Sequence, residues 1–185
     1  MDQYKSIEWR EGVVRMLDQR SLPLTTNYID YTDYREVADA IRTMVIRGAP
    51  AIGAAAAYGM ALAALHGEAE TPNQLKDIIA EAGNVLRKSR PTAVNLFWAI
   101  ERMEKKLLDP EYSDCTTLRK MALTEAHVIA NQDVQTNKSI GRNALPLIPD
   151  TARVIHHCNT GSLATVDYGT ALGVIRAAHD AGKKL

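Results

Sequence analysis

The run His156-His157-Cys158-Asn159-Thr160-Gly161 places a thiol where reactive groups gather in α/β proteins. A β-prone segment, Arg153–His157, precedes Cys158, and a turn that suits a helix start follows it. Ligands of open α/β sheets bind at the carboxyl ends of strands, and a helix N-terminus favours the reactive thiolate. The pattern predicts a reactive cysteine, although a small buried thiol is the more common role of this residue type.

The two histidines do not extend this site to a metal. Neighbouring strand residues point to opposite faces, so His156 and His157 cannot both join Cys158 around one ion. We therefore predict no metal site and no cofactor, and we assign both histidines a structural role by default.

Two arginines stand directly before predicted helix starts, in Arg47-Gly48-Ala49-Pro50 and in Arg90-Pro91. Free backbone N–H groups at a helix N-terminus bind anions, and a guanidinium adds a forked cation that suits phosphate. If the two helix starts face one cavity, they form a two-arginine anion site. The alternatives are an ordinary helix–helix corner at Arg47 and two unrelated helix caps.

The elements that must position these residues are mostly helical. Ser6–Asp18 reads as a β-hairpin with its turn at Glu11-Gly12. Apolar spacing and Gly or Pro punctuation predict helices at about 33–47, 50–65, 72–88, 91–108, 116–137 and 139–147.

The character of the chain changes after residue 150. A strand at Arg153–His157, the Cys158 turn and a helix through Ala171–Ala178 form the opening unit of a parallel sheet. We predict a mainly α N-terminal domain at 1–150 with a hairpin at 6–18. Residues 151–185 are predicted as the first strand–helix unit of a truncated Rossmann-like α/β domain.

Composition bounds the partners. The formal net charge is +0, so no overall basic field recruits nucleic acid. The most apolar segment, Ala49–Leu65, is mostly alanine, which is too weakly hydrophobic for a membrane helix. With two separated cysteines and no signal-peptide pattern at Met1–Lys5, we predict a cytoplasmic protein without membrane attachment.

Three ordered motifs resemble those of the methylthioribose-1-phosphate isomerase family, which is akin to regulatory subunits of the eukaryotic translation initiation factor exchange complex. They are Ile41–Gly53 (IRTMVIRGAPAIG), Arg90–Leu96 (RPTAVNL) and Cys158–Leu172 (CNTGSLATVDYGTAL). Ile7-Glu8-Trp9 and Leu17-Asp18-Gln19 fit as well, so the resemblance covers essentially the whole chain.

The resemblance implies an aldose–ketose isomerase that acts on a phosphorylated sugar and works as a homo-oligomer. Arg47, Gly48 and Ala49 would bind substrate, Arg90 would join them at the phosphate, and Cys158 would stand at the reacting carbons. The second catalytic group of the family is an aspartate of the C-terminal domain, for which the chain up to Leu185 has no counterpart. Because this partner is missing, we expect the segment by itself to be incomplete and inactive.

Three alternatives stay open. Two are related isomerases, one for ribose 1,5-bisphosphate and one for a deoxypentose 1-phosphate. The third is a non-catalytic binding protein like the exchange-complex subunits, which the retained Arg47, Arg90 and Cys158 argue against. Asp167 belongs to the predicted helix after the third motif and is not assigned the role of the missing aspartate.

Overall fold

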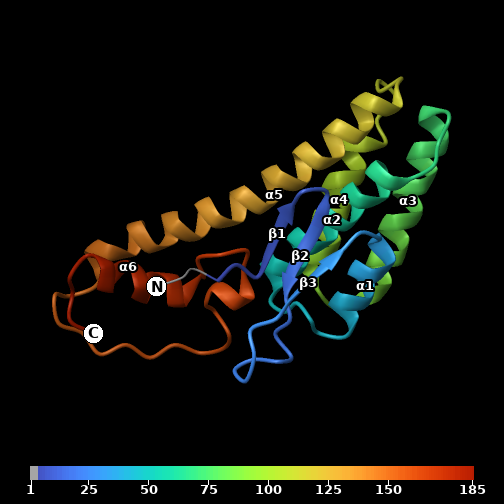
Figure 1. Ribbon diagram of the computed structural model, residues 1–185. Helices are drawn as coiled ribbons and strands as arrows, with labels where there is room; N and C mark the ends of the chain where they lie inside the picture. Colours follow the sequence, from blue (N-terminus) through green and yellow to red (C-terminus); the bar gives the residue numbers. More distant parts are fainter. Residues whose placement is uncertain (1–3) are drawn as a thin grey trace.

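Six α-helices and a small antiparallel sheet make up residues 4–185, the part of the chain that the computed structural model describes (Figure 1). The helices are α1 (Tyr34–Arg42), α2 (Ala49–His66), α3 (Pro72–Ser89), α4 (Val94–Leu107), α5 (Cys115–Ala144) and α6 (Ala171–Asp180). Two 3₁₀ turns, η1 (Leu145–Leu147) and η2 (Ser162–Ala164), flank the loop before α6. The predicted fold class, mainly helical after an N-terminal hairpin, is confirmed.

The predicted hairpin forms from β1 (Ile7–Arg10) and β2 (Val13–Leu17). Its two turn residues have φ of 49° at Glu11 and 91° at Gly12, the left-handed pair that a two-residue hairpin turn requires.

A third strand, β3 (Tyr28–Tyr31), pairs with β2 and was not predicted. It is only four residues long and carries Asp30, a residue that disfavours strands. Across the two strands, Arg15 donates two hydrogen bonds of 2.7 Å to Asp30. This long-range pairing compensates for the weak local preference.

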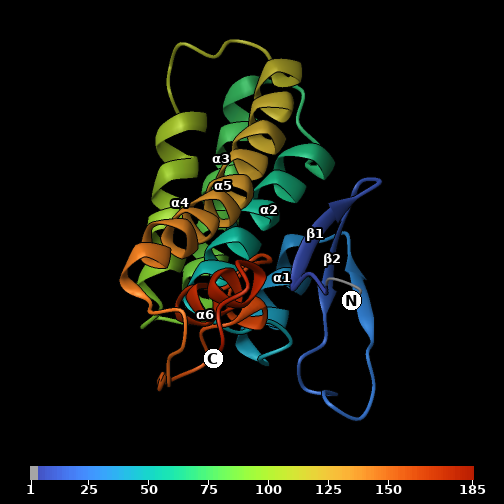
Figure 2. The same cartoon turned by 90° about the vertical axis from the view of Figure 1, so that its left-hand side faces the viewer.

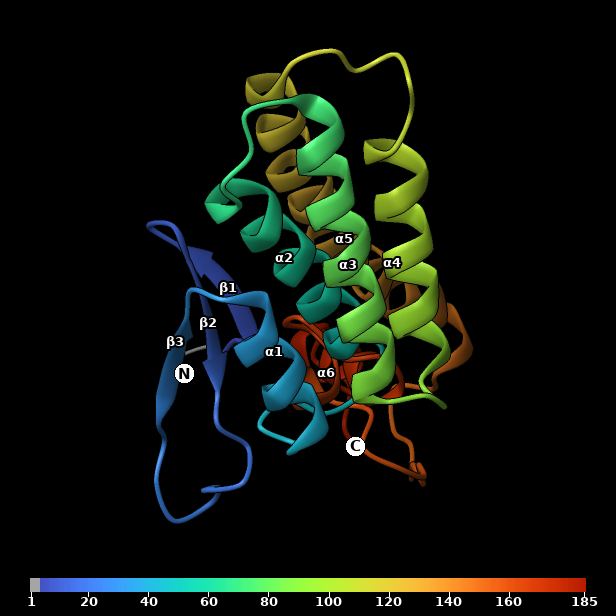
Figure 3. The ribbon, with the colours of Figure 1, turned by 90° about the vertical axis from the view of Figure 1, so that its right-hand side faces the viewer.

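Helix α2 is the centre of the fold. Its own residues are alanine and other apolar types on every face, which is typical of a helix buried among neighbours. It packs against α1, α3, α4 and α5, and the sheet covers its remaining side (Figures 2 and 3). Its length and mean hydropathy also match those of a membrane span, but 78% of the segment is buried inside this fold.

Two helix boundaries differ from prediction. Helix α4 begins at Val94 rather than at Pro91, because residues 91–93 form a turn in which the Ala93 N–H bonds the Arg90 carbonyl. The two helices predicted at 116–137 and 139–147 form one helix, α5, which runs the length of the molecule (Figure 1). Packing against α6 at Gly141 continues α5 past residue 138.

The predicted strand at Arg153–His157 does not form. In the part of the chain that the structure describes, these residues join no ladder, and the one bridge nearby pairs Thr151 with Lys184 in parallel. A parallel strand needs a neighbour along its length, and the described chain supplies only the start of one at Lys184.

Removing the side chain of Leu86 is expected to destabilise the helical core. Leu86 is fully buried on α3, and a Cβ added to Gly59 of α2 would lie 3.2 Å from its methyl groups, so it fills the space above that glycine. We expect Leu86→Ala to lower the free energy of unfolding by about 2–5 kcal/mol, measured by urea denaturation. Asn84→Ala, at an exposed site of the same helix, should change it by less than about 0.5 kcal/mol. Equal effects would contradict this account of the core.

Candidate active site

The first motif forms the start of α2. Gly48 is the N-cap residue, with φ 88°, and no side chain caps this end of the helix. The N–H groups of the first turn have no partner within the helix. Pro50, at the second helical position, has no backbone N–H group. Arg47 is exposed directly before this turn. The helix start therefore presents uncapped backbone donors next to a guanidinium, as predicted for an anion site.

The third motif lies against the first. A Cβ at Gly48 would lie 2.2 Å from the carbonyl oxygen of Ala164 and 2.3 Å from its Cα. Only glycine permits this approach of two backbones, so the Arg47–Ala49 corner and the loop that follows Cys158 are in direct contact.

The second motif reaches the same helix end from α4. A Cβ at Gly53 of α2 would lie 3.0 Å from the carbonyl oxygen of Asn95, so the first turns of α2 and α4 lie side by side. Arg90 is half-buried and is the C-cap residue of α3, four positions before α4 begins. The prediction that Arg90 stands directly before a helix start is therefore wrong, but the turn it belongs to leads into a helix start beside that of α2.

Cys158 is exposed and has φ 78°, in the left-handed region that side chains with a Cβ rarely adopt. Such strained residues cluster at functional sites, where the surrounding structure holds them. No helix follows Cys158 directly, contrary to prediction, because η2 and a loop intervene before α6. The motif nevertheless touches a helix N-terminus: the Leu172 N–H of α6 donates a 3.1 Å hydrogen bond to the Thr160 hydroxyl.

Three residues that sequence reasoning missed hold the loop 162–166 to the sheet region and to α5. The Ser6 hydroxyl donates to the Ser162 carbonyl (2.8 Å), and the Gln19 amide donates to the Leu163 carbonyl (2.7 Å). The Val166 N–H donates to the Asp133 carboxylate (2.8 Å). We call these three residues, Ser6, Gln19 and Asp133, the loop clamp.

One member of the loop clamp left a signal in the sequence. The buried face of α5 includes Ala126, Ala130, Asn137 and Gly141, and Asp133 continues the same helical spacing. A carboxylate on a buried stripe needs a partner, which is a reason to look for a buried polar contact there. Ser6 and Gln19 carried no comparable signal, because each lies in a short irregular segment beside a strand.

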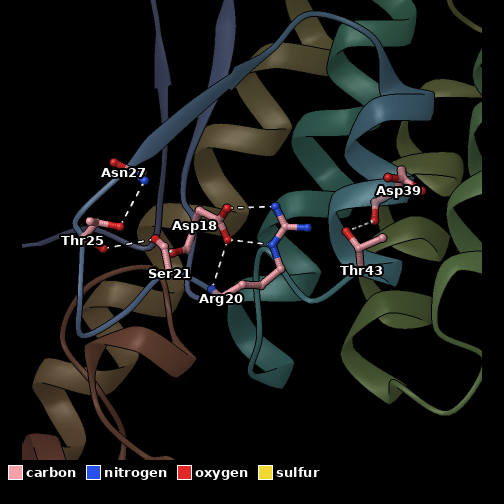
Figure 4. Close-up of polar contacts among 7 residues, drawn as sticks. All are labelled: Asp18, Arg20, Ser21, Thr25, Asn27, Asp39 and Thr43. Carbon is pink, nitrogen blue, oxygen red and sulfur yellow. Dashed lines mark hydrogen bonds and ion pairs between the residues drawn. The ribbon is translucent and has the colours of Figure 1, made fainter.

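The turn that carries Gln19 is shaped by an ion pair. Asp18 accepts hydrogen bonds from the Arg20 guanidinium, at 2.8 Å to each oxygen, and from the Arg20 N–H at 3.0 Å (Figure 4). The hydrogen bonds from Arg20 hold the pKa of Asp18 below its ordinary value. Ser21 and Thr25 close the loop that follows, as Figure 4 also shows. Gln19 lies between the two paired residues and its N–H bonds the Val45 carbonyl at 3.0 Å.

Two carboxylates interact at the loop, Asp133 of α5 and Asp167 of the loop itself. Burial raises the pKa of Asp133, hydrogen bonds from Val166 and Asn137 oppose this rise, and the charge of Asp167 adds to it. Asp167 is buried and precedes α6, so its predicted place within that helix is wrong. Asp167 therefore belongs to the loop between Gly161 and Thr170, whereas Asp133 reaches it from α5.

The chain is similar to known proteins of one family. Residues 45–185 match the model of the Initiation factor 2 subunit family. Methylthioribose-1-phosphate isomerases of Syntrophotalea carbinolica and Geobacter sulfurreducens are each 51% identical over 98% of this chain. In both cases the match covers 53% of the relative, so the chain spans about half the length of the curated relatives it matches.

Two solved structures share the fold. The crystal structure of 5-methylthioribose 1-phosphate isomerase from Pyrococcus horikoshii superposes with a TM-score of 0.91 at 37% identity, over 100% of this chain and 51% of that one. The translation initiation factor eIF-2B, subunit delta, from A. fulgidus superposes with a TM-score of 0.85 at 41% identity, over 97% and 52%. On the match of its residues 45–185 to the family model, the chain belongs to the Initiation factor 2 subunit family.

Proposed function

We propose that this chain provides the phosphate-binding corner and the catalytic thiol of an aldose–ketose isomerase. The reaction would convert 5-methylthioribose 1-phosphate to 5-methylthioribulose 1-phosphate, a step of methionine salvage. The observation that carries the proposal is the meeting of three motifs around the start of α2, at Gly48–Ala164 and at Gly53–Asn95. Relatives about 50% identical to the chain bear the name of this isomerase, which supports the choice of substrate.

The phosphate would bind at the start of α2. Uncapped N–H groups and the positive end of the helix dipole favour an anion there. The family resemblance places Gly48 and Ala49 among the substrate-binding residues. Arg47 and Arg90 would add the two guanidinium groups that balance the charge of a phosphate dianion. The corner would thereby hold the sugar in one orientation relative to Cys158.

The chemistry needs an acid and a base at the sugar carbons. Phosphate on the anomeric oxygen prevents ordinary opening to a free aldehyde, so the ring oxygen must be protonated as the ring opens. A hydrogen then moves from C2 to C1, through an enediol or as a hydride. Cys158 would stabilise the transition state or move a proton there, together with an aspartate that the family resemblance assigns to the C-terminal half.

Further features of the proposal follow from the same relatives. Residues 1–150 would act as the phosphate-binding domain, and residues 151–185 would begin an α/β domain that carries the remaining substrate contacts. The complete enzyme would be a cytoplasmic homo-oligomer that needs no cofactor.

Joining this chain to the C-terminal half of a relative tests the proposal. We expect a protein made of this chain followed by the C-terminal half of the Geobacter sulfurreducens relative, here called the joined protein, to convert 5-methylthioribose 1-phosphate. Product formation is followed by NMR of the sugar carbons. Neither this chain nor the C-terminal half alone should show turnover, because each supplies only one group of the catalytic pair.

The same assay separates the alternatives. Faster conversion of ribose 1,5-bisphosphate or of a deoxypentose 1-phosphate would assign the enzyme to that substrate instead. A folded joined protein that converts none of the three sugar phosphates would contradict the isomerase. It would favour a binding protein, a reading for which the likeness to the A. fulgidus eIF-2B delta subunit is the specific observation.

A further inference from the structure

Hydrogen bonds and a close backbone contact connect different parts of the segment that follows Cys158. The Thr170 N–H bonds the Thr160 carbonyl at 2.8 Å, which closes the loop at its base. The Gly169 N–H bonds the Thr165 hydroxyl at 3.0 Å, and a Cβ at Gly169 would lie 2.8 Å from Gly161. These contacts join the two ends of the loop to each other and its C-terminal end to its middle. A shift of residues 162–166 should therefore move Thr160 and, two residues before it, Cys158.

The loop clamp decides where this unit sits. Its three side chains come from the segment before β1, from the turn after β2 and from α5, so they hold residues 162–166 from three directions. Ser6 and Gln19 donate to carbonyl oxygens of the loop, and the Ser6 N–H also donates to the Val166 carbonyl at 3.2 Å. Asp133 differs, because it provides the acceptor for the buried Val166 N–H.

Asp133 is also held rigidly by its own helix. The Asn137 amide donates a 2.9 Å hydrogen bond to the second oxygen of the same carboxylate. Asn137 is 2% exposed, so this bond is shielded from water and fixes the side chain of Asp133 on α5. A carboxylate that accepts from a fixed side chain and from a loop N–H forms a firm link between helix and loop.

We propose that Asp133 is the positioning residue for Cys158. By accepting the Val166 N–H, it holds the loop 160–170 against Gly48 and so sets the distance between the anion-binding corner and the thiol. The catalytic consequence rests on the proposed function, whereas the effect on the loop does not.

Two variants separate the role of the Asp133 side chain as a hydrogen-bond acceptor from the role of its negative charge. Asp133→Ala removes the acceptor for Val166, and Asp133→Asn keeps an oxygen in its place while Asn137 can turn its amide to match. Leu86→Ala is the control for general destabilisation, since Leu86 lies on α3 within the main core, against Gly59 of α2, and takes part in none of the bonds of the loop clamp. Gln19→Met tests the clamp a second way if Asp133→Ala does not fold.

The first readouts use the 185-residue chain and need no activity. In Asp133→Ala we expect hydrogen exchange at the Val166 N–H to quicken at least about tenfold, the loss that one charged hydrogen bond makes. We also expect the alkylation rate of Cys158 by iodoacetamide, divided by that of Cys115, to change at least about threefold, because Cys158 loses its fixed setting while Cys115 on α5 does not. Asp133→Asn should stay within twofold of the native chain in both, as should the ratio in Leu86→Ala.

Two outcomes would overturn the proposal. If Asp133→Ala frees the Val166 N–H but leaves the alkylation ratio unchanged, the Thr160 contacts with α6 alone hold Cys158. If Leu86→Ala changes the ratio as much as Asp133→Ala does, the effect is general instability. If Asp133→Ala does not fold, Gln19→Met must change the ratio, and an unchanged ratio there would also count against the clamp.

The joined protein then tests the catalytic consequence. We expect Asp133→Ala to lower kcat about tenfold or more with KM changed by less than threefold, since the phosphate corner keeps its contacts, and Asp133→Asn to restore kcat. A loss confined to KM would contradict a positioning role toward the thiol. A joined protein without activity would refute the proposed function while leaving the exchange and alkylation results to decide the role of Asp133.

Discussion

Cys158→Ser in the joined protein is expected to lower kcat for 5-methylthioribose 1-phosphate by about 10²- to 10⁴-fold, the range typical of a lost proton-transfer group. A serine hydroxyl is a far weaker acid than a thiol, so it would be a much poorer group for moving a proton at the sugar carbons. The substitution keeps the size and backbone demands of the residue, so KM should stay near its native value. Initial rates over a range of substrate concentration measure both constants.

Cys115→Ser is the matched control for this substitution. Cys115 is the other cysteine of the chain and is the first residue of α5, outside the three motifs. We expect the Cys115→Ser joined protein to keep at least about half of its activity. Full turnover by Cys158→Ser, or an equal loss in both variants, would remove Cys158 from the catalytic pair.

The strained backbone of Cys158 allows function and stability to be separated. A residue with a Cβ at φ 78° costs about 1 kcal/mol that glycine does not. Cys158→Gly should therefore raise the free energy of unfolding of this chain by about 1 kcal/mol and still abolish turnover in the joined protein. A Cys158→Gly variant that is more stable but inactive would indicate that the strained backbone is retained for function. A less stable variant would show that packing of the Cys158 side chain contributes to stability.

Gly48→Ala is expected to have the largest effect on the assembly of the site. Its Cβ would lie within 2.6 Å of three backbone atoms of Ala164, and backbone cannot move aside as a flexible side chain can. The left-handed φ of 88° adds about 1–2 kcal/mol for any residue with a Cβ. We expect a total loss of at least about 3 kcal/mol in urea denaturation and displacement of the loop 161–167 from the start of α2.

Gly12→Ala isolates the contact from the backbone conformation. Gly12 has φ 91°, close to that of Gly48, and a Cβ there would meet no atom within 4 Å. It should lose only the conformational part, about 1–2 kcal/mol. The difference between the two variants measures the contact between the first and third motifs. Equal losses would show that this close approach contributes nothing to stability.

The helices and the hairpin could be predicted from local patterns. Local residue types predict two of these elements, the helix at Ala51–Leu62 and the turn at Glu11-Gly12. A helix buried on all sides requires apolar residues on every face, and a left-handed turn favours glycine. The merged α5 and the short β3 could not be predicted in the same way. Contacts from residues far along the chain decided them, Gly141 with α6 and Asp30 with Arg15.

The sequence by itself determined which residues could carry the chemistry: the forked cations Arg47 and Arg90, the flexible corner at Gly48, and the thiol of Cys158 among turn-forming residues. These follow from the chemistry of each side chain and need no neighbours.

Only the tertiary structure decided that these segments meet. The approaches of Gly48 to Ala164 and of Gly53 to Asn95, and the bond from Val166 to Asp133, join residues that are distant in the sequence. Such contacts depend on how α2, α4 and α5 pack, and packing is a property of the whole core rather than of any local pattern. The tertiary structure therefore brought the three motifs together at the start of α2, and it added Asp133, whose carboxylate bonds the loop of the third motif.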